Sequence, residues 1–170
     1  MIGPKAYIHI DRLKNNLSNI KKEIGDKSLM VVVKADGYGH GALTIARALR
    51  NENKIIFCVF TIKEALELRD GGITNNIFIF SKMQPSWLKI AHQKDFWINL
   101  TSFEDLNEVL KFYEKYKACP KIHIKFDTGM TRLGFDLNEA EPLFKLLKSN
   151  KHIPIEGIYS HLSTADEGDL

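Results

Sequence analysis

The sequence predicts an α/β protein built from repeated parallel βα units. Short runs of β-branched and aromatic residues alternate with amphipathic stretches of helical length, and the connections between them are short. Several of the short runs are apolar almost without alternation, which is typical of strands covered on both faces. Units of this kind close into a barrel or open into a doubly wound sheet, and the pattern alone leaves both architectures open.

Seven segments have the composition of strands. In chain order they are residues 6–10, 30–34, 55–60, 76–80, 96–100, 121–126 and 155–160. The stretches between them, such as 11–24 and 42–49, predict helices that pack one apolar face against a sheet. No low-complexity tract, linker or short repeat interrupts the alternation, so we expect one continuous series of βα units.

Two of the connecting stretches begin with a capping signal. Thr61 and Glu64 have the capping-box spacing, in which each side chain binds the other residue's backbone N–H. Thr101 and Glu104 repeat this spacing farther along the chain. We expect a helix to begin at each of these places.

Polar and charged side chains gather where the predicted strands end. These residues are Lys34, Lys125, Asp127, Arg132 and His161. In parallel barrels and in open sheets alike, ligands bind at the carboxyl ends of the strands. A buried strand end is a costly place for a cation unless a site needs it. These five residues are therefore the candidate functional residues.

Lys34 has the setting of a nucleophilic amine. Burial at an apolar strand end lowers the pKa of a lysine, because the charged form loses its hydration. Gly37, Gly39 and Gly41 follow it and allow the chain to turn tightly around a ligand, while the phenol of Tyr38 can donate to a phosphate. The alternative is that Lys34 extends to the solvent and that the glycines only shape a turn.

Three segments resemble motifs of the alanine racemase family. Residues 31–41, VVVKADGYGHG, resemble the family's pyridoxal 5′-phosphate lysine motif, in which alanine is commoner at the place of Gly37. Residues 125–135, KFDTGMTRLGF, and residues 157–167, GIYSHLSTADE, resemble two further segments of the family. All three stand in the family's order, and the sequence is identified as a member of it.

The resemblance implies an incomplete TIM-type (β/α)8 barrel. A complete barrel takes about 250 residues, so these 170 residues hold about six of its eight strands. The family's β-rich C-terminal domain would be absent. Residues 1–10 would be the N-terminal strand that normally pairs with that domain, and residues 11–170 would be the partial barrel.

The resemblance also implies roles for three of the residues. Lys34 matches the lysine that holds pyridoxal 5′-phosphate covalently and then exchanges the Cα proton on one face of the amino acid. Tyr38 matches a tyrosine that contacts the phosphate. Arg132 matches an arginine near the phenolic oxygen of the cofactor and the carboxylate of the substrate, which suits the planar guanidinium group.

Two further roles have a structural alternative. His161 matches a histidine of the polar network around the cofactor, and the alternative is a buried, hydrogen-bonded core histidine. Lys125 matches a lysine that carries a carbamate in some family members and steadies the arginine. The alternative for Lys125 is a plain ion pair with Asp127.

The implied activity is that of an isomerase, alanine racemase, which interconverts L-alanine and D-alanine and supplies D-alanine for peptidoglycan. In the family the second base is a tyrosine from the C-terminal domain of the partner subunit, so a homodimer is expected for the full-length protein. No residue here matches that tyrosine, and we expect the isolated chain to be inactive. The alternatives are a broader amino-acid racemase and a truncated, non-catalytic pyridoxal phosphate binder.

Composition argues against several other classes of protein. The net charge is +3 and the basic residues are scattered, so nucleic acid is not an expected partner. No run of about 18 apolar residues predicts a membrane span, and the N-terminus lacks the apolar region of an export signal. Cys58 and Cys119 lie too far apart to suggest a metal site or a disulfide scaffold. We therefore expect a cytoplasmic protein that acts on a small molecule.

Overall fold

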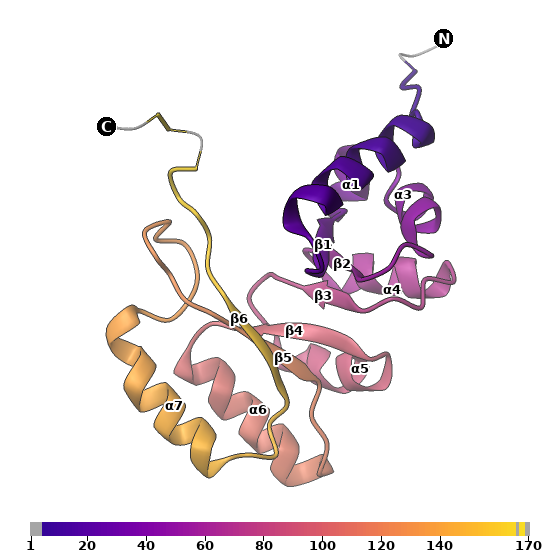
Figure 1. Cartoon of the computed structure of the whole chain (residues 1–170). Coiled ribbons are helices and arrows are strands. Elements are labelled where there is room, and N and C mark those ends of the chain that lie inside the picture. The colour runs from indigo at the N-terminus through magenta and orange to yellow at the C-terminus, as the bar shows by residue number, and fades with distance from the viewer. Residues whose placement is uncertain (1–4, 166, 169–170) are drawn as a thin grey trace. The chain divides into compact units, whose positions relative to one another are not determined.

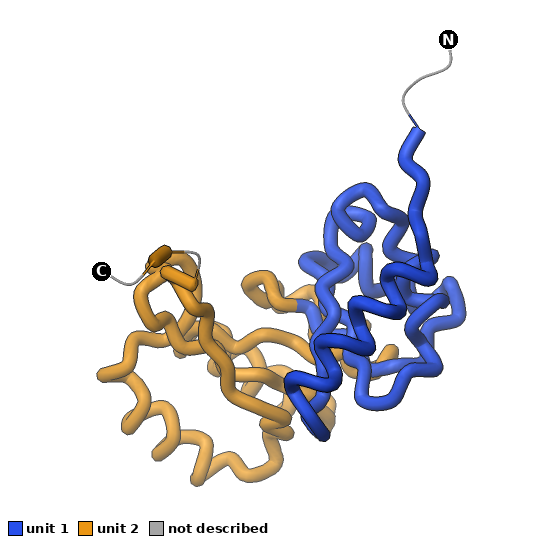
Figure 2. Tube along the Cα trace, turned by 45° about the horizontal axis from the view of Figure 1, so that its top comes forward, with its two compact units in different colours: residues 1–79 blue, residues 80–170 orange. Residues whose placement is uncertain are grey.

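Residues 5–165 and 167–168 are described by a computed structural model of the chain (Figure 1). The chain divides into two compact units, residues 1–79 (unit 1) and residues 80–170 (unit 2), which Figure 2 shows in different colours. Within the described residues, each unit contains three parallel strands with helices between them. The predicted α/β class is therefore confirmed.

Unit 1 carries the first three strands. They are β1 (Leu29–Val32), β2 (Ile55–Val59) and β3 (Ile77–Ile79), and the helices of this unit are α1 (Ile10–Ile24), α2 (Lys34–Tyr38), α3 (Ala42–Leu49) and α4 (Ile62–Asp70). The strands pair in the order β1-β2-β3, with Leu29 opposite Ile55 and Phe57 opposite Ile77. Because the strands are parallel, the turns that follow β1 and β2 both lie at the carboxyl ends of the strands of this sheet.

The centre of unit 1 is formed by β2 and β3. Phe57 and Ile77 are fully buried, and Leu49 of α3 and Leu68 of α4 are buried with them. These two strands are covered on both faces, as their continuous apolar runs predict. In β1, by contrast, half-buried residues alternate with exposed ones.

Unit 2 carries the last three strands. They are β4 (Phe96–Leu100), β5 (Lys121–Lys125) and β6 (Ile155–Tyr159), accompanied by the helices η1 (Pro85–Trp87), α5 (Leu88–Gln93), α6 (Phe103–Tyr116), η2 (Leu137–Glu139) and α7 (Ala140–Ser149). The pairing order is β4-β5-β6. Leu106 of α6 and Leu143 of α7 are buried in the core of this unit.

One face of the unit 2 sheet carries polar and aromatic side chains. Asn99 lies opposite His123, and His123 lies opposite Gly157 in the next strand. The His123 ring stacks on Trp97, with the two ring centroids 4.9 Å apart. A Cβ atom at Gly157 would lie 3.0 Å from His123 Cδ2, so the ring occupies space that only a glycine leaves open. Desolvation lowers the pKa of His123, which keeps this packed ring neutral.

Six of the seven predicted strands are confirmed, with small shifts at their ends. The strand predicted at 6–10 is wrong, because residues 5–9 have no regular secondary structure and α1 begins at Ile10. A strand needs a hydrogen-bonded neighbour, and no strand in the described part of the chain pairs with this segment. The assignment of residues 1–10 to a separate domain stays a prediction, and residues 1–4 lie outside the described residues.

One predicted helix cap is confirmed and the other is displaced by one residue. At α4 the Thr61 hydroxyl accepts from the Glu64 backbone N–H, and the Glu64 carboxylate accepts in return from Thr61 N. The box predicted at Thr101 and Glu104 is wrong. The N-cap of α6 is Ser102, whose hydroxyl accepts from Asp105 N, while Thr101 Oγ1 donates to the Asp105 carboxylate at 2.6 Å. Ser102 therefore caps α6 from one side only, because the Asp105 carboxylate accepts from Thr101 N and Thr101 Oγ1 and not from the Ser102 backbone.

Both cysteines are free thiols. Cys58 lies buried within β2, and Cys119 is half-buried ahead of β5. Desolvation raises the pKa of each thiol to about 12, so neither forms an appreciable amount of thiolate at neutral pH. No helix in the described part of the chain combines the length and the apolar character that crossing a membrane requires.

Candidate active site

The backbone that follows β1 takes an uncommon path at the predicted cofactor lysine. Lys34 lies two residues beyond the last residue of β1 and opens α2, so it belongs to the turn and not to the strand. Ala35, Asp36, Gly37 and Tyr38 then have φ angles of 50°, 53°, 63° and 56°. Left-handed backbone costs about 1–2 kcal/mol for each residue that carries a Cβ atom, and it normally occurs at single positions. Residues 34–41 are called the Lys34 turn below.

Hydrogen bonds within unit 1 hold the Lys34 turn in this shape. Ala35 N donates to Glu64 Oε1 at 2.7 Å, and Asp36 Oδ1 accepts from Ala42 N at 2.8 Å. Gly41 N donates to the carbonyl oxygen of Asp36 at 2.8 Å. The first two residues of the left-handed stretch are therefore tied to neighbouring elements, Ala35 to α4 and Asp36 to the start of α3.

The side chain of Lys34 lies between two aromatic rings. Its Nζ is 5.8 Å from the ring centroid of Tyr38 and 5.8 Å from that of Phe60. Tyr38 is 61% exposed, so its phenol can reach a bound molecule. The half-buried Lys34 amine and the exposed Tyr38 phenol are thus brought together by the turn.

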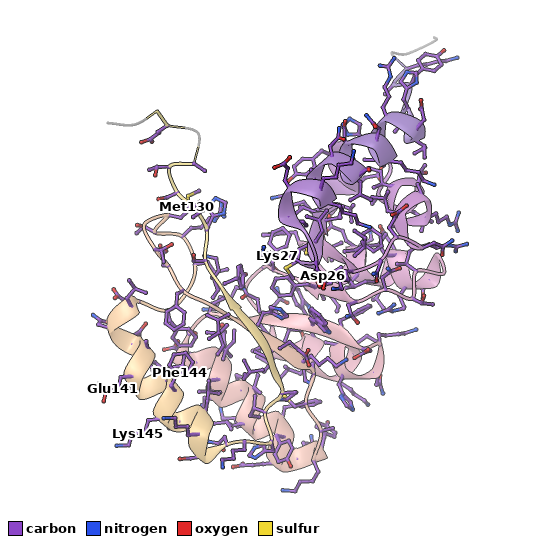
Figure 3. The ribbon with its side chains drawn as sticks, viewed as in Figure 1. Asp26, Lys27, Met130, Glu141, Phe144 and Lys145 are labelled. Carbon is purple, nitrogen blue, oxygen red and sulfur yellow. The ribbon has the colours of Figure 1, made fainter. Side chains whose placement is uncertain are left out.

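In unit 2, a loop after β5 presents Arg132. The loop of residues 127–134, called the Arg132 loop below, is closed at its base by a bridge between Phe126 and Phe135. Asp127 N donates to Phe135 O at 2.9 Å, and Phe135 N donates to Lys125 O at 2.8 Å. Arg132 itself is exposed, and Met130, labelled in Figure 3, lies in the same loop.

The carboxylate of Asp127 organises the inside of the Arg132 loop. Its Oδ1 accepts from Gly129 N at 3.0 Å and from Thr131 N at 2.9 Å, and its Oδ2 accepts from Arg132 N at 2.9 Å. Hydrogen bonds from the backbone of Thr131, Gly129 and Arg132 hold the pKa of Asp127 below its ordinary value. The backbone position of Arg132 is therefore set by a carboxylate five residues earlier.

Lys125 is buried beneath the Arg132 loop. Its Nζ donates to Leu133 O at 2.6 Å and lies 5.9 Å from the ring centroid of Tyr159. Desolvation lowers the pKa of Lys125; Asp127 opposes this effect and Arg132 adds to it. The amine is thus held against the loop backbone. Because its pKa is lowered, a larger fraction of it is neutral than in a surface lysine at the same pH.

His161 lies two residues beyond β6 and is exposed, so the alternative of a buried core histidine is wrong. Its carbonyl oxygen accepts from Thr128 Oγ1 at 3.1 Å, which joins this segment to the Arg132 loop. A cavity of about 470 Å³ lies here, lined by Thr128 and residues 160–165. The structure thus brings His161 beside the Arg132 loop within unit 2.

The family model described as alanine racemase, N-terminal domain, matches residues 8–169. The chain belongs to this family. The predicted membership of the alanine racemase family is therefore confirmed.

Individual alanine racemases give the same result. The alanine racemase of Methanococcus maripaludis is 36% identical over 167 residues, which covers 96% of this chain and 44% of that protein. The alanine racemase of Clostridium tetani is 38% identical over 166 residues, covering 96% of this chain and 43% of that protein. A solved alanine racemase of Clostridium difficile 630 has a TM-score of 0.84 at 33% identity, covering 92% of this chain and 42% of that one. The chain spans less than half the length of these relatives, and its fold is the predicted incomplete (β/α) barrel.

One contact near the alanine racemase lysine motif could not be found from the sequence. Thr61 and Glu64 are recognisable as a capping box, but the box accounts for only one oxygen of the Glu64 carboxylate. The other oxygen binds Ala35, whose sequence separation of 29 residues carries no local signal. The contact of Asp127 with Gly129 N is local and could have been suspected, since aspartate side chains commonly bind the backbone two residues on.

The hydrogen bonds of these carboxylates predict that the alanine racemase domain loses stability at acid pH. Desolvation raises the pKa of Glu64, but hydrogen bonds from Ala35, Thr61 and Phe60 bring it below its ordinary value. A carboxyl group of this kind stabilises the fold fully above its unfolded pKa of about 4.3, and the contribution is lost as the pH falls through the lower folded value. We expect the free energy of unfolding to fall below about pH 4, and to fall less steeply in Glu64→Gln. Denaturant titrations at stepped pH measure both slopes, and equal slopes would contradict the prediction.

Proposed function

We propose that this chain is the cofactor-carrying part of an alanine racemase, an isomerase that interconverts L-alanine and D-alanine and supplies D-alanine for peptidoglycan. The observation that carries the proposal is the Lys34 turn, which holds an amine and a phenol together at the end of β1 in a chain of the alanine racemase family. We further propose that the protein acts in the cytoplasm, as a homodimer in its full-length form.

The residues present fit pyridoxal 5′-phosphate. Lys34 offers an amine to the cofactor's aldehyde, and the exposed Tyr38 phenol can donate a hydrogen bond to its phosphate. When bound, the cofactor supplies the electron sink that makes the Cα proton of an amino acid acidic enough to remove. Lys34 Nζ then takes that proton, or returns it, on one face of the substrate.

The residues of unit 2 have supporting tasks in this proposal. The guanidinium group of Arg132 would bind the substrate carboxylate through two parallel N–H groups and would also contribute to binding the cofactor. His161 would belong to the polar residues that hold the cofactor. Lys125, with its lowered pKa, has an amine suited to carry a carbamate that steadies Arg132, and the ion pair with Asp127 is the alternative.

Racemisation needs a second proton donor on the opposite face of the substrate. We propose that it comes from the C-terminal domain of the partner subunit in the full-length protein, since no residue of this chain matches such a base. Residues 1–170 alone are therefore expected to be inactive, or orders of magnitude slower than a typical enzyme at about 10 s⁻¹. A coupled D-alanine assay on the purified chain tests this, and turnover at an ordinary rate would contradict it.

The full-length protein tests the proposed function directly. It should develop a visible absorption band with pyridoxal 5′-phosphate and form D-alanine from L-alanine. Equal rates across a panel of amino acids would favour the broader racemase, and an absorption band without turnover would favour a non-catalytic binder.

Replacing Arg132 with lysine tests whether the planar guanidinium group is needed or only its positive charge. Arg132→Lys keeps the positive charge but loses the planar pair of donors, so we expect kcat/KM of the full-length enzyme to fall by about tenfold to a hundredfold. Arg12→Lys on the exposed surface of α1 is the matched control and should leave kcat/KM unchanged. Wild-type kinetics in Arg132→Lys would remove this residue from the site.

A further inference from the structure

Glu64 makes more contacts than a helix cap requires. Its Oε2 accepts from Thr61 N at 2.9 Å and from Phe60 N at 2.8 Å, which completes the capping of α4. Its Oε1 accepts from Ala35 N at 2.7 Å. A capping box uses the glutamate to bind the N-cap backbone alone, so the contact with Ala35 is additional to it.

The contact falls at a strained position. Ala35 is the first of the four left-handed residues, and it carries a Cβ atom. Such a conformation persists only when the surrounding structure fixes it. A hydrogen bond from a backbone N–H to a carboxylate is stronger than one between neutral groups, so it is well suited to this task.

The hydrogen bond at Ala35 also affects Lys34, because a peptide bond joins the two residues. The N–H of Ala35 belongs to the peptide group that joins it to Lys34. Fixing that N–H fixes the orientation of this peptide plane, and with it the direction in which the Lys34 side chain leaves the backbone. Glu64 is half-buried, and its pKa lies below the ordinary value, so the carboxylate is charged at neutral pH.

We propose that Glu64 is a positioning residue for Lys34, holding the Lys34–Ala35 peptide so that the amine is presented to the cofactor. The inference rests on the proposed function only in assigning the cofactor to Lys34. The hydrogen bond and its effect on the turn can be tested without any cofactor.

The chain offers two matched controls for loss of a cap. Thr61→Ala removes the hydroxyl that caps α4, together with its 3.3 Å hydrogen bond to Glu64 Oε2, but keeps the Glu64 carboxylate whose Oε1 accepts from Ala35 N. Glu139→Ala removes the glutamate of a second capping box, where Glu139 Oε2 accepts from Asp136 N at 2.8 Å. Neither residue contacts the Lys34 turn through a hydrogen bond in the described part of the chain.

The first experiment measures amide hydrogen exchange of Ala35. In Glu64→Ala, and in Glu64→Gln should the alanine variant fold poorly, exchange at Ala35 should be about tenfold or more faster than in the wild type. The two control variants should keep the wild-type rate at Ala35 even where their melting temperature falls. Unchanged exchange in a folded Glu64 variant, or equal acceleration in Thr61→Ala, would overturn the proposal.

The second experiment measures how fast Lys34 reacts. Each protein is mixed with pyridoxal 5′-phosphate, reduced with borohydride at timed intervals and mapped by peptide, with the exposed Lys63 as the internal reference. The ratio of label on Lys34 to label on Lys63 should fall about tenfold in the Glu64 variants and stay at the wild-type value in Thr61→Ala.

The two experiments keep the two proposals apart. If wild-type Lys34 is labelled no faster than Lys63, the proposed function fails, and the exchange of Ala35 still decides whether Glu64 fixes the turn. If wild-type Lys34 is labelled preferentially and the Glu64 variants keep the same ratio, the positioning role is overturned and the proposed function stands.

Discussion

Replacing Lys34 with alanine is expected to abolish covalent attachment of pyridoxal 5′-phosphate. Lys34 follows β1 at the carboxyl end of the parallel strands, where ligands bind in α/β sheets. Its Nζ lies 5.8 Å from the ring centroids of Tyr38 and Phe60. Its amine is the group we assign to the aldehyde, so the variant should lose the visible absorption band completely. Borohydride reduction and peptide mapping of the wild type should place the pyridoxyl label on Lys34.

The control for this experiment is Lys63→Ala. Lys63 lies on α4 of the same unit with 86% of its side chain exposed, and its loss should leave both the absorption band and the label in place. An absorption band that survives in Lys34→Ala, together with a label on a different lysine, would contradict the assignment.

The largest loss of stability is expected from Gly134→Ala. A Cβ atom at this position would lie 2.7 Å from Asp127 N and 2.8 Å from the carbonyl carbon of Phe126, and φ is +130°. Both neighbours are backbone atoms and cannot move aside as the end of a side chain can. The substitution should therefore open the bridge between Phe126 and Phe135 at the base of the Arg132 loop, at a cost of about 2–4 kcal/mol in the free energy of unfolding.

Gly72→Ala separates the steric effect at Gly134 from simple backbone strain. Gly72 also has a positive φ of +85°, but nothing lies within 4 Å of its Cβ position. Its substitution should cost only about 1–2 kcal/mol. Denaturant unfolding of both variants measures the difference. Equal costs would show that the close approach at Gly134 is relieved without disturbing the bridge.

The strands could be predicted because their signal is local. All five residues of β4 are buried, and the run at 96–100, which is apolar except for Asn99, marks the same bounds in the sequence. The segment 6–10 has a similar composition but forms no strand. Composition indicates which residues suit a strand, whereas a strand itself depends on a neighbour elsewhere in the chain.

The sequence motifs name the candidate site residues, whose roles stay predictions, but they do not show the path of the backbone around them. The motifs identify Lys34 and Arg132, and each lies on a turn after a strand. The left-handed path through Ala35 and Asp36 is not visible in the sequence, because these residue types rarely adopt it in succession. This path is held by the hydrogen bond from Ala35 N to Glu64, whereas the sequence near Glu64 indicates only that it caps α4. Long-range hydrogen bonds of this kind are fixed by tertiary structure.

The two thiols described above make the chain a convenient host for a spectroscopic probe. With both pKa values at about 12, Cys58 and Cys119 should react slowly with maleimides at neutral pH. A third cysteine introduced at the exposed Met130 would then be the preferred target for a fluorophore. Because Met130 lies in the Arg132 loop, such a fluorophore would test whether this loop moves when the carboxylate ligand that we propose for Arg132 is added, without removal of either cysteine of this chain.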